Sequence, residues 1–256
     1  LLNAARKIDP NAIDLSGKIF VTAGLGGMSG AQPKAAVIAK GVCIVAEINP
    51  KATYKRHQQG WVDEVYKNID DLLERALVAR NKKEAVSLAY DGNIVDLLER
   101  IIEREINIEI GSDQTSLHNP WAGGYYPVDL SFEDANEMMN KNPEFFKQKV
   151  RETLIRHLNA VNTLTERGMY FFDYGNAFLL ECSRAGADVV KENGDFKYPS
   201  YVQDIMGPMC FDYGFGPFRW VCASNYPKDL EITDNIACEV LKKLMKNSPD
   251  EIKSQM

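Results

Sequence analysis

The feature that most constrains the fold of this chain is a glycine-rich turn between a β-type run and a helix-forming run. Residues 18–21 are β-type, four of the seven residues 24–30 are glycine, and a helix-prone segment begins at Pro33. Glycine allows positive φ and lets the backbone approach a ligand closely. Strand, turn and helix in this order place backbone N–H groups and a helix N-terminus where a pyrophosphate can bind. The turn therefore predicts a dinucleotide site or, as the alternative, an ordinary tight strand–helix connection.

A second apolar run favours the dinucleotide interpretation. Residues 42–46 are apolar throughout and are followed by Glu47, 20 residues after Gly27. A dinucleotide-binding fold has at this place the carboxylate that binds the adenosine ribose hydroxyls. The glycine spacing is irregular, because Ser29 stands where the third glycine of G-x-G-x-x-G would be and Gly30 follows one residue later.

Composition argues against several other classes of protein. The chain has 256 residues, 45% of them hydrophobic and 26% charged, as in ordinary globular proteins. Its net charge of −6 gives no basic surface for nucleic acid. No apolar run approaches the roughly 20 residues of a membrane span. The five cysteines are dispersed and form no C-x-x-C, so we expect no metal site or disulfide framework, and a reducing, cytoplasmic compartment.

β-type runs alternate with amphipathic runs through the first 190 residues. Strands are expected at 18–23, 42–48, 86–90, 106–110 and 169–174, with a short strand or turn at 61–66 after a polar segment at 49–60. Helices are expected at 1–7, 33–40, 68–80, 94–104 and 142–168. A short helix capped by Ser131 and a helix that ends at Ala185 are also expected. This order predicts an α/β fold: a Rossmann-like, doubly wound, mostly parallel sheet with helices on both faces. Ligands of such sheets bind beyond the carboxyl ends of the strands.

The alternation stops near residue 190. Residues 198–220 are rich in proline, glycine and aromatic residues, and one more helix is expected at 233–246. We predict a Rossmann-like NAD-binding domain over 1–190 and the start of an incomplete C-terminal region, a short extension, over 191–256. The chain has no initiator Met and begins in a helical pattern. We therefore expect it to be part of a longer protein.

One expected strand tip carries six polar side chains in the seven residues 113–119. They are either loop caps of a common kind or contacts to the cofactor. His118 is the only histidine in a candidate site, where it would be a general acid or base, or else a hydrogen-bonded loop residue. His57 and His157 are expected on the surface or on a helix face.

Aromatic residues and one arginine follow in three glycine-containing segments. Tyr125 and Tyr126 would stack on a flat ligand or simply pack. Tyr174 ends a buried strand and is expected to face the crevice. Arg219 would grip a carboxylate in a bidentate manner, or stack on a neighbouring aromatic ring. Among the cysteines, Cys43 is expected in the core.

Five motifs in order resemble the urocanase (urocanate hydratase) family, and the resemblance spans nearly the whole chain. They are Thr22-Ala23-Gly24-Leu25-Gly26-Gly27-Met28-Ser29-Gly30-Ala31-Gln32-Pro33, Asp113-Gln114-Thr115-Ser116-Leu117-His118-Asn119-Pro120, Gly124-Tyr125-Tyr126-Pro127, Phe172-Asp173-Tyr174-Gly175-Asn176 and Gly216-Pro217-Phe218-Arg219-Trp220. Five motifs in register are far more specific than a glycine-rich turn alone.

The resemblance implies a lyase of histidine catabolism that adds water to urocanate and gives imidazolonepropionate. Urocanases hold NAD⁺ tightly and use it as an electrophile without net redox change. By resemblance, Arg219 would bind the substrate carboxylate, and the protein would be a homodimer. The residues implied to contact NAD are Gly27, Met28, Ser29, Glu47, Asn93, Ile94, Gln114, Thr115, Ser116, Leu117, His118, Tyr125, Tyr126 and Tyr174.

The chain departs from the family pattern in two ways. Ala52 stands where the family has an arginine, whose place Lys51 or Arg56 could take. The early glycine-rich segment of the family and its signature segment with the active-site cysteine are absent, and Cys222 does not replace that cysteine. The catalytic residue is therefore unknown, and we expect the chain to be a central fragment that does not turn over by itself.

Two other functions remain compatible with the turn and Glu47. An ordinary NAD-dependent dehydrogenase would need a Tyr–Lys pair or a catalytic histidine, and no Tyr-x-x-x-Lys follows a strand tip. A non-catalytic nucleotide sensor would have no need of Arg219 or of the 113–120 segment.

Overall fold

A computed structural model describes residues 1–175, 177–214, 216 and 222–248. The chain divides into two compact units, Leu1–Tyr201 and Val202–Met256. The compact units divide after Tyr201. The expected division into domains after residue 190 stays a prediction.

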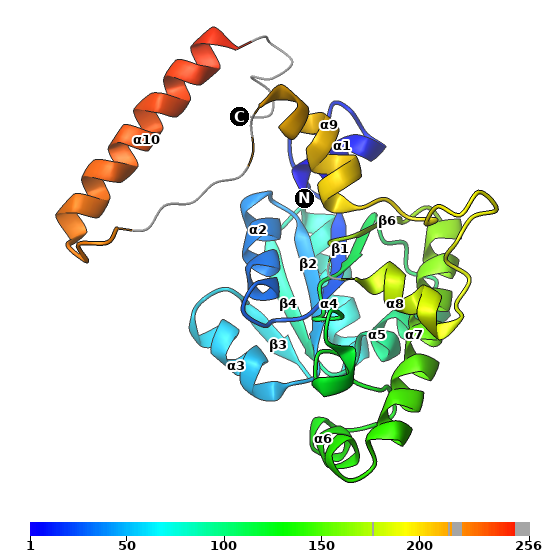
Figure 1. Ribbon diagram of the computed structural model, residues 1–256. Helices are drawn as coiled ribbons and strands as arrows, with labels where there is room; N and C mark the ends of the chain where they lie inside the picture. The colour runs from blue at the N-terminus through cyan, green and yellow to red at the C-terminus, as the bar shows by residue number, and fades with distance from the viewer. Residues whose placement is uncertain (176, 215, 217–221, 249–256) are drawn as a thin grey trace. The chain divides into compact units, whose positions relative to one another are not determined.

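The first unit is built on one six-stranded sheet whose strands all run parallel (Figure 1). The strands are β1 (Ile19–Ala23), β2 (Val42–Glu47), β3 (Glu64–Tyr66), β4 (Val86–Asp91), β5 (Ile110–Asp113) and β6 (Tyr170–Asp173), in the order β3-β4-β2-β1-β5-β6. The chain leaves β1 on the β2 side and returns to its other side at β5. The carboxyl ends of β1 and β5 therefore flank the switch point of the sheet, where ligands of such folds bind.

Helices cover both faces of this sheet, as the sequence predicts. Right-handed crossovers put α2 (Gln32–Ile38) and α3 (Pro50–Gln58) on one face, and α4 (Ile69–Lys82), α5 (Ile94–Glu103) and α7 (Pro143–Glu166) on the other (Figure 1). The central strands are buried on both faces: all five residues of β1 are buried, and Cys43 on β2 is fully buried in the core. Shorter helices complete the unit: α1 (Leu2–Ile8), α6 (Phe132–Lys141) and α8 (Phe178–Ala185).

Side-chain caps fix where several of these helices begin. The side-chain oxygens of Asn49, Asn68, Asn93 and Asn142 each accept a hydrogen bond from a first-turn N–H of α3, α4, α5 and α7. Ser131 Oγ likewise accepts the Asp134 N–H of α6, as the cap expected there requires. Each such cap contributes about 1 kcal/mol. The caps also fix the ends of the loops that precede them, and the loops that end at Asn49, Asn93 and Ser131 reach the candidate site.

Two elements differ from the sequence prediction. The polar segment 49–60 contains the helix α3, whose inward face offers only Thr53 and Arg56 as buried residues and so lacks an apolar stripe. The fourth long strand, β5, covers Ile110–Asp113 instead of 106–110. Ile106 and Ile108 are buried but lie before the strand. The close pairing of β5 with β6 requires glycine at position 111, because a Cβ on it would lie 2.6 Å from Met169 Sδ, just before β6.

Another segment of the unit pairs with one edge of the sheet, and an ion-pair network lies at the other. At the β3 edge, Arg75 bridges Glu64 and Glu84, with Nη2–O distances of 2.8 and 2.6 Å. At the β6 edge, Asp173 N donates to Pro199 O at 2.9 Å, and Asp173 forms an isolated bridge with Ser200.

The second unit is mainly helical in the part that the structure describes. A π-helical segment at Tyr201–Met206 leads into it from the first unit, followed by α9 (Gly207–Met209), a 3-10 turn at Phe211–Tyr213 and α10 (Pro227–Asn247). The expected last helix is thus present and begins at Pro227, not at residue 233, with the proline in its first turn. Among the described residues, no helix combines the length and apolarity needed to cross a membrane.

Candidate functional site

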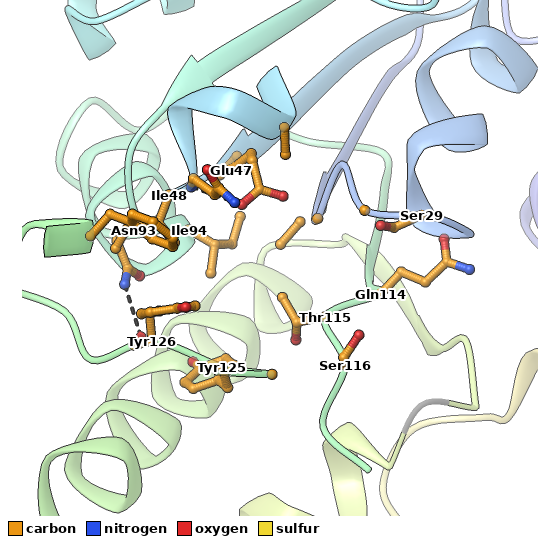
Figure 2. Close-up of a pocket in the computed structure, with 18 of the residues that line it drawn as sticks. Ser29, Glu47, Ile48, Asn93, Ile94, Gln114, Thr115, Ser116, Tyr125 and Tyr126 are labelled. Atoms are coloured by element: carbon orange, nitrogen blue, oxygen red, sulfur yellow. Dashed lines mark hydrogen bonds between the residues drawn. The ribbon is translucent and has the colours of Figure 1, made fainter. Parts of the chain in front are cut away.

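A pocket opens at the carboxyl ends of β1, β2, β4 and β5, next to the switch point (Figure 2). It is lined by residues of the glycine-rich turn, the ends of β2 and β4, and the segments after β5: Ala23, Gly24, Gly26, Ser29, Ala46, Glu47, Ile48, Asn49, Ala52, Gly92, Asn93, Ile94, Gln114, Thr115, Ser116, Gly123, Gly124, Tyr125, Tyr126 and Phe132. Every lining residue belongs to the first unit. The sheet therefore brings together four segments that the sequence places up to about a hundred residues apart.

The carboxylate of Glu47 joins the glycine-rich turn to the start of α3. Its Oε2 accepts the Leu25 N–H at 2.7 Å and its Oε1 accepts the Asn49 N–H at 2.9 Å. Burial raises the pKa of Glu47, while these two backbone donors work in the opposite direction. Each carboxylate oxygen retains a lone pair, so Glu47 holds the turn and can still accept a hydroxyl hydrogen from a ligand.

Asn93 uses both ends of its amide within the protein. Its Oδ1 accepts the Val95 N–H at the start of α5, and its Nδ2 donates to Tyr126 O at 3.1 Å, the bond drawn in Figure 2. Asn93 thereby ties the turn after β4 to the segment that carries Tyr125 and Tyr126. The tyrosine hydroxyls are also engaged, because Tyr126 Oη donates to Asn136 Oδ1 at 3.2 Å.

The segment after β5 is organised by Asp113. Asp113 Oδ1 accepts both the Thr115 N–H and the Thr115 hydroxyl, which folds the chain back into an Asx turn. Gly124 closes the same loop: its carbonyl accepts the Ser116 N–H, and its own N–H donates to Asn119 O, both at 3.1 Å. A Cβ on Gly124 would lie 2.2 Å from Ser116 O, so the loop requires glycine here.

Three polar side-chain atoms on this segment are buried without a hydrogen-bond partner among the described residues: Ser112 Oγ, Asp113 Oδ2 and Gln114 Oε1. Buried polar atoms are nearly always hydrogen-bonded, so each orphan needs a cause. Gln114 borders the pocket, and its amide oxygen is buried behind the pocket surface. For Asp113, complete burial raises the pKa to about 7, with the charge of Asp173 acting in the same direction.

A buried histidine supports the pocket wall from behind. Tyr125 Oη and His157 Nδ1 on α7 are 3.0 Å apart, and the two groups are almost fully buried. Burial lowers the pKa of His157 to about 3, so the ring is neutral. Of the two placements expected for His157, the surface or a helix face, the structure shows the second: it lies on the buried face of α7. Its signal in the sequence is position: it falls on the apolar face of α7, between Leu154 and Val161.

The structure brings most of the predicted cofactor residues together. Nine of them line the pocket: Ser29, Glu47, Asn93, Ile94, Gln114, Thr115, Ser116, Tyr125 and Tyr126. Gly27 and Met28 are exposed at the tip of the turn beside Gly26 and Ser29. Leu117 is fully buried, and His118 is exposed and outside the lining.

The remaining predicted residues lie away from the pocket or outside the described residues. Tyr174 is outside the pocket lining and instead stacks on Tyr201, with ring centroids 5.0 Å apart and planes 11° apart. Arg219, with the rest of its motif from Pro217 to Trp220, and also Asn176, lies outside the described residues. Of the two proposed replacements for the family arginine, Lys51 is exposed and Arg56 is buried, and neither lines the pocket, whereas Ala52 does.

The parallel sheet and the polar pocket at its switch point define a Rossmann-like α/β protein. Two family models match the chain: the urocanase Rossmann-like domain over residues 1–205 and the urocanase C-terminal domain over residues 208–253. The chain therefore belongs to the urocanase family.

Curated relatives agree with this assignment. A probable urocanate hydratase of Dictyostelium discoideum is 57% identical over 95% of this chain, and one of Caenorhabditis elegans is 52% identical over 100% of it. A human urocanate hydratase is 53% identical over 94%. These matches cover 36%, 38% and 37% of the respective relatives, so the chain spans a little over a third of their length.

Proposed function

We propose that this chain is the NAD-binding part of a urocanate hydratase, which adds water to urocanate and gives imidazolonepropionate. The observation that carries the proposal is the pocket at the switch point. Its lining comes from segments of the urocanase Rossmann-like domain, and it contains a partly engaged carboxylate, Glu47, and an unpartnered buried amide oxygen on Gln114.

The residues present fit a dinucleotide. Glu47 follows the second strand, where a Rossmann-like site holds the adenosine ribose, and each of its oxygens keeps a free lone pair. The turn needs glycine at position 24, whose φ is +93°, so that the chain can bend between β1 and the pocket. Gln114 would use its free oxygen to accept a hydrogen bond from the cofactor. Tyr125 and Tyr126 would form the wall, held in place by His157 and Asn93.

Bound NAD⁺ would supply a cationic ring that withdraws electrons from the substrate reversibly. The protein would supply orientation: the carboxylate of Glu47 at one end, the 113–119 segment along the pocket, and the tyrosine wall. By resemblance to the family, Arg219 would bind the carboxylate of urocanate. A homodimer in the cytoplasm is part of the same proposal and rests on the family alone.

Two measurements test the proposal. The first is calorimetric titration of the purified chain with NAD⁺, for which we expect saturable binding with one site per chain. The second uses a chimera in which this chain replaces the matching segment of human urocanate hydratase. We expect the chimera to consume urocanate, followed by loss of its ultraviolet absorbance, with the unaltered human protein as control.

The same chimera separates the alternatives. A folded chimera that binds NAD⁺ and reduces it with simple alcohols or hydroxy acids would support an ordinary dehydrogenase. A folded chimera that binds NAD⁺ but neither consumes urocanate nor reduces NAD⁺ would support a nucleotide sensor. Either result would contradict the proposal.

A further inference from the structure

Arg56, on α3, lies beneath the glycine-rich turn and contacts three consecutive carbonyls of it. Its Nε donates to Leu25 O at 3.1 Å, and its Nη2 donates to Gly26 O and, at 3.4 Å, to Gly27 O. Its Nη1 donates to Gln59 Oε1 at 2.8 Å. Arg56 is 8% exposed, and its guanidinium lies over the ring of Trp61, 4.9 Å from the ring centroid.

All four hydrogen-bond partners of Arg56 named above are neutral oxygens. A buried charge is normally paired with an opposite charge, because taking it out of water is costly. In the part of the chain that the structure describes, no carboxylate forms an ion pair with Arg56. Its positive charge is therefore directed into the turn, through the dipoles of the peptide groups that it contacts.

The carbonyl contacts decide where the N–H groups of the turn point. In a trans peptide unit the N–H lies opposite the C=O. Because the carbonyls of residues 25–27 point toward Arg56, the N–H groups of residues 26–28 point away from it. Within the described residues these three N–H groups donate to no protein acceptor, and Gly26 and Ser29 border the pocket on that side. Successive free N–H groups of this kind bind anions.

Gly30 makes room for this arrangement. A Cβ on Gly30 would lie 2.1 Å from Arg56 Nε and 2.7 Å from Cζ, far inside contact distance. Gly30 has no positive φ, so its backbone conformation does not require glycine. Its hydrogen side chain is needed because the guanidinium occupies the adjacent space.

We infer that Arg56 is a positioning residue of the cofactor site: it fixes the turn so that three backbone N–H groups and an uncompensated positive charge face the diphosphate of the dinucleotide. This inference rests on the proposed binding of NAD. Arg56 acts through the peptide groups and does not contact the ligand itself. It therefore differs from a replacement for the family arginine at Ala52, which borders the pocket.

The test is ligand binding by the purified chain, with NAD⁺, ADP-ribose and adenosine as probes. For Arg56→Met we expect affinities for NAD⁺ and ADP-ribose to fall at least tenfold, while the affinity for adenosine, which has no phosphate, changes less than twofold. A merely structural role would weaken all three alike and would overturn the inference. Arg56→Lys retains the charge but not the fork of donors, and should recover part of the loss.

A double-mutant cycle with Gly30 tests the geometry. Gly30→Ala should weaken NAD⁺ binding about as much as Arg56→Met, because the added methyl group displaces the guanidinium. In the double variant the second change should cost little more, since the space is already vacated. Additive losses would contradict the inference. Arg151→Met is the matched control, because Arg151 lies over Trp121 at 5.4 Å and is exposed.

Hydrogen exchange separates this inference from the proposed function. If the unaltered chain binds no NAD⁺ or ADP-ribose, the proposed function fails. The turn is still tested, because Arg56→Met should speed exchange at Leu25 and Gly30, whose N–H groups bond to Glu47 and Gly26. Unchanged exchange at both would show that Arg56 does not hold the turn.

Discussion

Asp113 on β5 lies directly opposite Asp173 on β6 in the register of the two parallel strands. Asp173 accepts the N–H groups of Gly175 and Leu179 with its two carboxylate oxygens. Asp113 is fully buried and has one oxygen without a partner among the described residues. Burial and the charge of Asp173 together explain why the pKa of Asp113 is raised to about 7.

The first prediction concerns Asp113→Asn and pH. The folded state of the unaltered protein binds the proton of Asp113 up to about pH 7, whereas the unfolded state releases it near pH 4. The folded state thus holds more protons, and stability falls as pH rises from 5 to 7, by at most about 1.4 kcal/mol per pH unit. Asparagine removes this slope. Urea unfolding at pH 5 and pH 8 should show the variant gaining stability relative to the unaltered protein at pH 8. A constant difference would contradict the assignment.

His157→Gln should change the pH dependence of stability in the direction opposite to that of Asp113→Asn. The pKa of His157 is about 3 in the folded state, well below its ordinary value, so the unfolded state binds the proton first as pH falls. Stability contributed by the neutral ring is present above about pH 6.5 and is lost toward pH 3. Glutamine should lower stability at pH 7 by about 1–2 kcal/mol through the weakened Tyr125 contact, and should reduce the loss between pH 7 and 4.5. The readout is chemical unfolding at both pH values.

Gly124→Ala should disrupt the loop after β5 and leave the sheet intact. The added Cβ would collide with the Ser116 and Asn119 carbonyl oxygens, at 2.2 and 2.4 Å, and backbone atoms cannot move aside as a flexible side chain can. We expect NAD⁺ affinity to fall at least tenfold, with circular dichroism unchanged. Gly207→Ala is the control, since a Cβ there meets only Val202 O at 3.6 Å. Affinity retained within twofold would show that the loop is not part of the site.

Glu47→Gln should lower both the stability of the turn and the affinity for the ligand. Glutamine can present one oxygen to an N–H donor, but its NH₂ group would then face the second donor, on Leu25 or Asn49. We expect a loss of stability of about 1–2 kcal/mol and a fall in NAD⁺ affinity of at least tenfold. Glu103→Gln, at the exposed end of α5, controls for the loss of one charge. Titration calorimetry and thermal unfolding measure the two effects separately, and an unchanged affinity would remove Glu47 from the site.

Much of the fold could be predicted because long apolar runs and helix caps are local signals. β1, β2 and β4 are apolar over most of their length, and Asn142 with Pro143 begins α7 at the expected residue. The strand β5 could not be placed, because Gly-Ser-Asp has low strand propensity and pairs only through its close approach to β6. The helix α3 was missed because its buried positions are a threonine and an arginine.

Sheet topology gathers some of the residues predicted for the site into one pocket, while their roles stay predictions. Ser29, Glu47 and Gln114 meet because their strands end at one edge. The sequence does not reveal which polar atoms of these residues already form hydrogen bonds within the protein. Asn93 uses its amide to cap α5 and to bind Tyr126 O, and the Tyr125 hydroxyl pairs with His157. The contacts to Tyr126 and His157 join residues more than thirty positions apart in the sequence.

The two edges of the sheet have a consequence for the behaviour of the protein at high concentration. An open strand edge is a template for strands of other molecules and leads to aggregation. Here β3 is three residues long and its Glu64 is bound by Arg75, while β6 already pairs with the segment at Pro199 and Ser200. Short edge strands, charged edge residues and covered edges limit pairing between molecules, so we expect the sheet of the first unit to remain six strands wide in a concentrated solution.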